Sequence, residues 1–531
     1  MKLHLLYPDS DLDLRLALPA ASRDLEQDLG LGIVFGAMGG GDPFVRDISR
    51  HVVLASVIDP EVIRWRQDAL DDCARLPGMA RDLYAVALDA IERQRKVWGW
   101  SDTFADSVVR RAVDTLKLLI DSMRRIRQVA RANAGQVHSQ AFRRLFSQME
   151  SELDVRFLAE VEAHLLRLGG RDEVSMTASL GVGARSTDFT LTRRTRKASW
   201  RERLGLPERD TFAYEIAPRD EAGSHALGEL RNRGLALAAD SIARSSDHVV
   251  SFFTQVRNEL AFYLGCLNLA AALAMTGAPL VRPEALEPGT GVLEADGLYD
   301  VALRLASRSD VVGNDLDCRG VSLLLVTGAN RGGKSTFLRS LGTAQVMLQA
   351  GMPVGARRFR TDVRPGVLTH FRREEDATLE HGKLDEELGR MSVVVDRVGP
   401  GVLVLMNESF SSTNEREGSE IGRGVIEGLL DAGASVALVT HMYDLASAFF
   451  ADGRPDARFL RAERLPDGHR TFRIVDGEPL PTSHGQDVYE RVFSPGASDQ
   501  GVPPARATAV PAIGTAADPG SGASHAPGAA T

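Results

Sequence analysis

A glycine-rich run near residue 330 has the residue types and the spacing of a phosphate-binding loop, and it matches the pattern GxxxxGK[ST] in full. In this pattern backbone N–H groups curl around phosphates, a lysine (here Lys334) reaches the β- and γ-phosphates, and a hydroxyl (here Ser335) binds Mg²⁺. The apolar run 321–326 before it and the helical pattern 336–348 after it supply the strand and the helix that such a loop needs. We therefore expect ATP and Mg²⁺ to bind at this loop. Its residues are Gly328, Ala329, Asn330, Arg331, Gly332, Gly333, Lys334, Ser335 and Thr336.

A second buried run, 402–406, ends in Asn407 and Glu408. An acidic residue in this place can activate or orient the water that attacks a γ-phosphate, so Glu408 is the candidate catalytic base. An aspartate that helps to hold the metal usually occupies the place of Asn407, and an amide keeps the oxygen but loses the charge. We therefore predict a metal site at Ser335, Asn407 and Glu408 with weakened Mg²⁺ coupling.

A third apolar run, 434–439, ends in Thr440 and His441. Because it follows the acidic strand, His441 is a candidate for sensing or positioning the γ-phosphate during catalysis. A histidine that closes a strand is also often structural only, and the sequence leaves both interpretations open.

The elements that carry these residues lie in the C-terminal part of the chain, and a helical pattern fills most of the N-terminal part from about residue 29 to 170. Alternating apolar residues then predict a small β-rich insert at about 172–220, and helical periodicity resumes over 226–275. A stretch rich in Pro, 279–290, reads as a boundary. The predicted division is an N-terminal segment 1–28, a helical core or lever domain 29–290 containing the insert, an α/β P-loop NTPase domain 291–494, and a disordered tail 495–531.

The insert contains the most basic locale of the chain. Six cationic residues crowd a short span in which only Glu202 opposes them. Such a cluster is a candidate for contacting the phosphates of DNA, and the alternative is a solvated loop. The six residues are Arg193, Arg194, Arg196, Lys197, Arg201 and Arg203.

Bulk properties restrict the class of protein. The formal net charge of -9 argues against indiscriminate coating of nucleic acid, so any contact with DNA must be a local basic patch. Three widely spaced cysteines give neither a CxxC metal site nor a disulfide framework, which fits a reducing compartment. The first residues lack a signal-peptide pattern, and the longest apolar stretch, 260–275, is too short to span a membrane. We expect a cytoplasmic protein with no membrane contact.

Three segments together resemble the ATPase domain of the MutS family of DNA mismatch-repair proteins. They are VTGANRGGKST, LMNESFSSTNEREG and THMYDL, and the likeness extends with decreasing specificity to DPEVIRWRQDAL upstream and SHGQDV downstream. The resemblance implies an ABC/MutS-type P-loop ATPase preceded by lever helices, with the β-rich insert where the family carries its DNA clamp. It also implies that ATP binding moves the lever.

The same resemblance implies a homodimer with composite ATP sites. In it Asn414 and its neighbours reach the nucleotide of the other subunit from a polar loop that opens a helix over 419–430. Two positions differ from the family, because Asn414 stands where Ser is common and Val311 where many relatives place an aromatic residue against the adenine. Only about thirty residues precede the lever, so we expect a short MutS-like ATPase without the mismatch-recognition domain.

Three functions are consistent with these residues. The leading hypothesis is a DNA-coupled ATPase of DNA repair that switches conformation with ATP and has a repair-pathway protein partner. The alternative is a nucleotide-controlled switch that binds a protein or RNA partner with little turnover, which Asn407 favours and Glu408 and His441 oppose. A P-loop kinase would need an acceptor pocket and a lid that the sequence does not reveal.

Overall fold

The computed structural model describes residues 2–96, 105–168, 176–180, 186–191, 220–307, 310–373, 382–465 and 469–480. The chain forms two compact units, Met1–Ser483 and His484–Thr531, and the second lies outside the described residues. The predicted disordered tail and the six cationic residues of the insert also lie outside the described residues.

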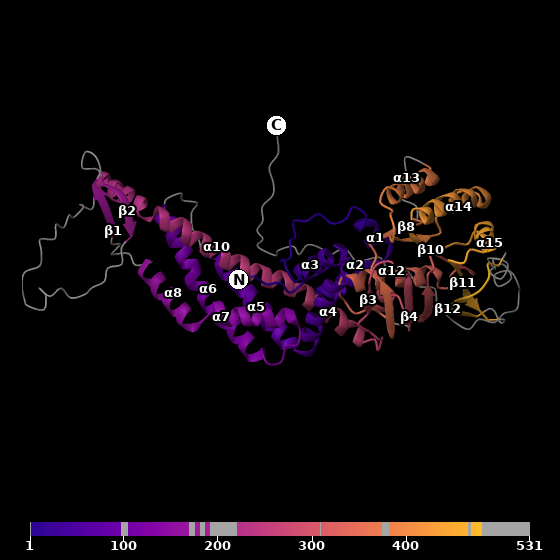
Figure 1. Cartoon of the computed structure of the whole chain (residues 1–531), viewed down its shortest axis with the longest axis horizontal. Coiled ribbons are helices and arrows are strands. Elements are labelled where there is room, and N and C mark those ends of the chain that lie inside the picture. The colour runs from indigo at the N-terminus through magenta and orange to yellow at the C-terminus, as the bar shows by residue number, and fades with distance from the viewer. Residues whose placement is uncertain are drawn as a thin grey trace, which may run out of the picture. The chain divides into compact units, whose positions relative to one another are not determined.

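The N-terminal part is helical, as the sequence predicts. Its helices are α1 (Ser22–Asp28), α2 (Leu31–Gly39), α3 (Pro43–Leu54), α4 (Pro60–Arg75), α5 (Pro77–Arg95), α6 (Ala105–Asn133), α7 (Gln140–Glu152), α8 (Val155–Leu168) and α10 (Glu221–Ala274). Helices α3 and α4 each begin with a proline after an aspartate, and the side chains of Asp42 and Asp59 accept backbone N–H groups of the first turn. Helix α10 is 54 residues long and packs along α5 and α6 (Figure 1).

Two strands of the insert are confirmed. Strand β1 (Met176–Leu180) pairs antiparallel with β2 (Ser186–Leu191). Residues 192–219 of the predicted insert lie outside the described residues.

A six-stranded sheet forms the framework of the C-terminal part (Figure 1), in the order β12-β11-β6-β10-β9-β8. All neighbouring pairs are parallel except β11 with β12. The strands are β6 (Leu323–Thr327), β8 (Val367–Phe371), β9 (Leu403–Asn407), β10 (Ser435–Val439), β11 (Ala457–Arg464) and β12 (Arg470–Asp476). The three buried runs predicted from the sequence are β6, β9 and β10.

Both faces of this sheet are covered, which explains why its central strands β6, β9 and β10 are mainly apolar. Alternate residues of β6 divide between two cores: Leu324 and Val326 join the core that includes α12 (Lys334–Gln349), and Leu323 and Leu325 join the other. The second core includes residues of α13 (Lys383–Val395), α14 (Glu415–Asp431) and α15 (Tyr443–Ala451). The period of two along each strand thus places α12 on one face and the other three helices on the opposite face.

A smaller sheet with the order β3-β7-β4-β5 lies beside α12. Its strands are β3 (Glu284–Leu286), β4 (Val292–Leu298), β5 (Asn314–Arg319) and β7 (Arg358–Asp362), and the short helix α11 (Val301–Ala306) connects β4 with β5. Strand β3 precedes the predicted boundary at 290/291 but pairs with β7. By this pairing β3 belongs to the C-terminal part. The division into domains stays a prediction.

Within the part of the chain that the structure describes, none of the helices combines the length and the apolar character that crossing a bilayer requires.

Candidate functional site

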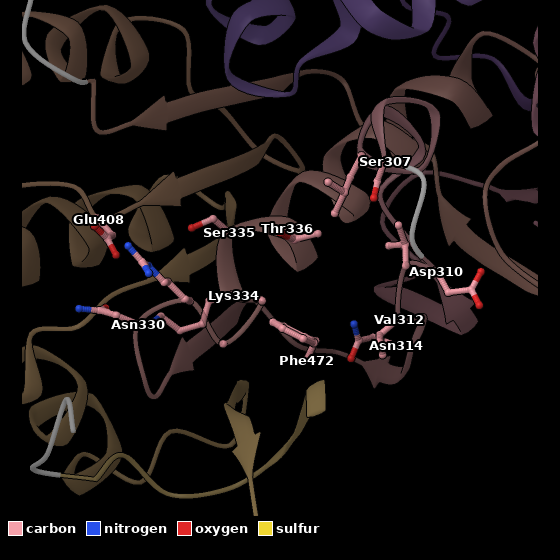
Figure 2. Close-up of a pocket in the computed structure, with 15 residues that line it drawn as sticks. Ser307, Asp310, Val312, Asn314, Asn330, Lys334, Ser335, Thr336, Glu408 and Phe472 are labelled. Carbon is pink, nitrogen blue, oxygen red and sulfur yellow. The ribbon is translucent and has the colours of Figure 1, made fainter. Parts of the chain in front are cut away.

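A pocket of about 350 Å³ opens where β6 runs through a loop into α12. Residues 330–336 line it together with Glu408, Val311 and Phe472. Figure 2 shows Glu408 and Asn330 at one end of this pocket and Asp310 and Val312 at the other. Its size suits a ligand as large as a nucleotide.

The loop has the conformation that a phosphate cradle needs. Gly328 and Gly333 have φ angles of 113° and 95°, which side chains rarely adopt, and Gly333 caps the N-terminus of α12. A Cβ at Gly332 would lie 2.7 Å from the Cβ of Ala462, so only glycine fits there. Arg331 also has a positive φ, 60°, between these glycines. The loop thus ends with the first N–H groups of α12 at the pocket, where the helix dipole favours an anion.

Lys334 is buried at the first position of α12. Its Nζ donates to the carbonyl oxygens of Gly328 and Ala329, at 2.8 and 3.1 Å, so the loop closes around the ammonium group. Burial lowers the pKa of Lys334, and the carboxylate of Glu408 opposes this shift. The ammonium group is therefore positioned beside the loop, close to the place where phosphates would bind.

Ser335 and Asn407 form the candidate metal position. Ser335 Oγ donates to Asn407 Oδ1 at 2.8 Å, across the gap between the start of α12 and the end of β9. A hydroxyl and an amide oxygen are hard ligands of the kind that Mg²⁺ accepts, and Mg²⁺ usually takes few protein ligands beside substrate phosphates. No group of three or more His, Cys, Asp or Glu residues that could hold a metal occurs among the described residues. These residues thus fit a Mg²⁺ ion that arrives with its phosphates.

Glu408 and His441 come together at adjacent strand ends. Asn407 of β9 pairs with Val439 of β10, so the residues that follow these two strands are neighbours. His441 Nδ1 lies 3.8 Å from Glu408 Oε1, which is too far for a hydrogen bond but close enough for electrostatic attraction. His441 lowers the pKa of Glu408, and Lys334 and Arg372 act in the same direction against partial burial. Glu408 is thus held as a half-buried carboxylate facing the pocket.

Two family models match the chain: the MutS2 N-terminal domain over residues 58–276 and MutS domain V over residues 324–495. The chain belongs to the MutS family. The domain V match includes the loop, Asn407, Glu408 and His441, so the site described above lies within the family's own P-loop domain.

Several curated members of the MutS family are similar to parts of the chain. An endonuclease MutS2 of Thermomicrobium roseum is 29% identical over 285 residues, which is 50% of this chain and 36% of the relative. The DNA mismatch repair protein MutS of Desulforamulus reducens is 31% identical over 184 residues, 34% of this chain and 21% of the relative. MutS protein homolog 4 of Mus musculus is 25% identical over 197 residues, 37% of this chain and 20% of the relative. The chain therefore spans only a minor part of the length of each of these relatives.

Asn414 is the N-cap of α14, whereas the sequence analysis placed it within a longer loop. Helix α14 begins at Glu415 rather than at 419, so the expected loop is four residues shorter. Asn414 is the N-cap: its Oδ1 accepts the N–H of Glu417 at 3.0 Å, and its Nδ2 donates to Glu417 Oε2 at 3.1 Å. Asn414 is exposed and does not line the pocket of its own chain. The resemblance to the MutS family predicts its contact with a second subunit, and that contact stays a prediction.

Phe472 is the aromatic residue among the pocket residues that the sequence analysis missed, and the others are Leu303, Ser307, Asp310, Val312 and Asn314. It lies on β12 with a φ angle of 59°, and its side chain is about half exposed. Figure 2 shows its ring beside the loop, between Lys334 and Asn314. Asn314 Oδ1 accepts the N–H of Ile474 at 2.7 Å and so attaches β12 to β5 next to the pocket. An aromatic residue among the polar residues of RTFRIVD was the available signal.

Proposed function

We propose that this MutS-family protein is a Mg²⁺-dependent ATPase of DNA repair whose ATP hydrolysis is coupled to DNA. The observation that carries the proposal is that one pocket is lined by the P-loop, including Ser335, and by Glu408. Asn407 is hydrogen-bonded to Ser335, and His441 lies beside Glu408. These groups supply the three requirements of phosphoryl transfer to water: charge stabilisation, a metal position and a base for the nucleophile.

Each residue has a defined part in this chemistry. Lys334 and the N-terminus of α12 stabilise negative charge on the β- and γ-phosphates. Ser335 and Asn407 would hold Mg²⁺, and the ion would supply positive charge to the phosphate oxygens. Glu408 accepts a proton from the attacking water or orients it, and its lowered pKa keeps the side chain ionised. Phe472 offers its ring to the adenine. It thereby takes the role that the resemblance to the MutS family assigns to an aromatic residue at the position of Val311.

A physical connection from the P-loop helix to the helical part supports coupling. The buried Gln349, at the end of α12, donates from Nε2 to Ser56 Oγ and to the carbonyl of Val57 in the α3–α4 turn, at 2.8 and 3.1 Å. Its Oε1 accepts the N–H of Arg364 at 3.0 Å. These hydrogen bonds join the end of α12 to the turn between α3 and α4. A shift of α12 would therefore also displace the helices that follow this turn.

DNA is the partner that the basic residues of the insert fit best, with Arg193, Arg194 and Arg196 as the first candidates. The active form is proposed as a homodimer in which Asn414 of one protomer approaches the ATP of its partner. A further protein of the same repair pathway would read the ATP-bound state.

The experiment that tests this function measures ATP hydrolysis with and without duplex, mismatched, branched and single-stranded DNA. Variants are Lys334→Ala and the triple alanine at Arg193, Arg194 and Arg196. A matched control is a triple alanine at the exposed Arg15, Arg46 and Arg397, which removes the same charge elsewhere. Stimulation by one form of DNA, lost in the first two variants and kept in the control, is expected. The absence of stimulation by every form would overturn the coupling to DNA.

One observation favours a second candidate, a nucleotide-controlled switch with little turnover. Asn407 places a neutral oxygen where a carboxylate would bind Mg²⁺ more strongly. Slow steady-state hydrolysis together with strong ATP-driven assembly would select the switch, and phosphate transferred to a small molecule would indicate a kinase instead.

A further inference from the structure

The turn that carries Glu408 is unusual in its backbone. Glu408 and Phe410 have φ angles of 55° and 62°, and both are non-glycine residues in the left-handed region. Such conformations persist only where the surrounding structure determines them, and they gather at functional sites. The contacts of Ser409, between these two residues, therefore bear on the direction of the Glu408 carboxylate.

One buried histidine holds both residues that follow Glu408. His370 lies on β8, and its Nδ1 is 2.7 Å from Ser409 Oγ. The same hydroxyl is 2.9 Å from the His370 carbonyl oxygen. The His370 ring also stacks on Phe410, with ring centroids 5.6 Å apart and an angle of 27° between the planes. Ser409 and Phe410 are thus fixed to β8 by a single residue, through its ring and its main-chain carbonyl.

The other side of the His370 ring is fixed as well. Its Nε2 is 3.0 Å from the carbonyl oxygen of Glu387 on α13, and a carbonyl requires a donor. Burial lowers the pKa of His370 to about 4, so the ring is neutral with its proton on Nε2. Nδ1 is then an acceptor, and it shares the single proton of the Ser409 hydroxyl with the His370 carbonyl oxygen. Glu387 returns to the same turn, because its Oε1 accepts the Ser412 hydroxyl at 3.0 Å.

We propose that His370, through Ser409, is a positioning residue that fixes the direction of the Glu408 carboxylate for attack of water on ATP. The inference rests on the proposed ATPase function and adds a residue to it. Glu408 has two further backbone restraints, since its N–H donates to Val439 at 2.8 Å and its carbonyl accepts the Ser411 hydroxyl at 2.7 Å. Loss of His370 therefore misdirects the carboxylate without unfolding the turn.

The test compares ATP hydrolysis and ATP affinity in variants of the full chain. His370→Phe keeps the ring stack and the main-chain carbonyl that accepts the Ser409 hydroxyl, but it removes both polar contacts of the ring. Ser409→Ala removes the hydroxyl and with it both of its contacts. Each is expected to lower kcat by roughly 10- to 100-fold, the order of effect of a 1 Å misplacement, while KM and the affinity for ATP change little. His370→Asn keeps an oxygen near the place of Nδ1 and should recover more of kcat than His370→Gln, which reaches the Glu387 side instead.

A second background separates positioning from a general effect on folding. In Glu408→Gln, which lacks the carboxylate, adding His370→Phe or Ser409→Ala should produce no further loss of kcat. Ser340→Ala, which removes a buried hydroxyl bonded only within α12, is the matched control and should keep the wild-type kcat. Thermal unfolding of each variant shows whether it is folded.

The outcomes distinguish this inference from the function on which it rests. Wild-type kcat in a folded Ser409→Ala or His370→Phe protein, with a strongly reduced but measurable kcat in Glu408→Gln, overturns the role of His370 and leaves the ATPase standing. An equal further loss of kcat in the Glu408→Gln background also overturns it. A wild-type protein that binds ATP without hydrolysing it overturns the ATPase and, with it, the role of His370.

Discussion

Two buried or half-buried carboxylates show how differently the two parts of this chain use the same chemical group. Glu259 of α10 is fully buried and accepts three backbone N–H groups, from Leu5 and Leu6 at Oε2 and from Leu12 at Oε1, over 2.8 to 3.0 Å. Glu408 is half-buried beside the pocket, and among the described residues its ion-pair neighbour is His441 at 3.8 Å. A carboxylate whose oxygens are occupied by the backbone holds a segment in place, whereas one that faces a cavity is available to a ligand.

The residues around Glu259 also hold the N-terminal segment in place. Arg66 of α4 is fully buried, and its Nε donates to the Leu6 carbonyl at 3.0 Å. Its guanidinium group lies 4.5 Å from the centre of the Tyr7 ring, and Tyr263 donates its hydroxyl to the Leu5 carbonyl at 2.7 Å. Charged and polar groups here bind the N-terminal segment to α4 and α10. Lys334, by contrast, directs its charge into a loop that borders a cavity.

The largest effect expected from this comparison is on the pH dependence of stability. Burial raises the pKa of Glu259 from 4.5 to about 7, against the three N–H donors. The folded state then binds a proton that the unfolded state releases, so this group's stabilisation is present below pH 4.5 and is lost as the pH rises through about 7. Glu259→Gln should remove that loss, which amounts to ~3 kcal/mol of the free energy of unfolding. Urea denaturation of both proteins across this pH range measures the difference.

Glu408→Gln is the matched control for that experiment. Its pKa is lowered, so its contribution to stability is lost only as the pH falls through the acid range, and the substitution should leave the profile near neutral pH unchanged. ATP hydrolysis should show the reverse, with activity lost in Glu408→Gln and kept in Glu259→Gln. A wild-type pH profile of stability in Glu259→Gln would contradict the structural role assigned to Glu259.

The sequence predicted the features that depend on short stretches of chain. The apolar runs before Gly328, Asn407 and His441 became parallel strands, and the pairing of these strands follows from their being buried on both faces. The start of α14 was wrong by four residues, although Asn414 and Glu417 have the spacing of a capping box. The spacing of Asn414 and Glu417 thus predicts the observed start of α14, whereas the polar composition of the segment favours a loop.

Contacts between distant residues were beyond the sequence. Glu259 lies 247 to 254 residues from its three donors, and His370 lies 39 residues from Ser409. Neither contact leaves a periodic pattern, because each depends on how complete elements pack. Phe472 was missed for the same reason, since β12 reaches the pocket through its pairing with β11 and through the hydrogen bond between Ile474 and Asn314, 160 residues apart.

A smaller effect is expected at the base end of the pocket. Phe472→Leu keeps an apolar side chain but removes the aromatic face, and stacking of a base on such a ring is worth ~1 kcal/mol or more. The affinity for ATP should fall about 5-fold with kcat nearly unchanged, because the ring lies away from Glu408 in the pocket (Figure 2). Phe450→Leu alters a partly exposed phenylalanine of α15 that does not line the pocket, and it should bind ATP as the wild type does. Equal affinity in the Phe472 variant would remove this residue from the site.

The smallest effect is expected on the Mg²⁺ dependence of hydrolysis when Asn407 is replaced by aspartate. This substitution adds a third carboxylate to the comparison of Glu259 with Glu408. An aspartate at 407 keeps an oxygen that accepts the Ser335 hydroxyl, now at 2.8 Å, so the geometry of the pair should persist. It adds a charge beside the metal, and the Mg²⁺ concentration for half-maximal hydrolysis should fall about 3- to 10-fold, equivalent to ~1 kcal/mol. Asn407→Ala removes the acceptor and should raise that concentration instead. If Asn407→Asp left the Mg²⁺ dependence unchanged, phosphate oxygens and Ser335 would hold the metal without help from this strand end. Asn407 would then resemble Glu259, a group that positions its neighbours, more than Glu408.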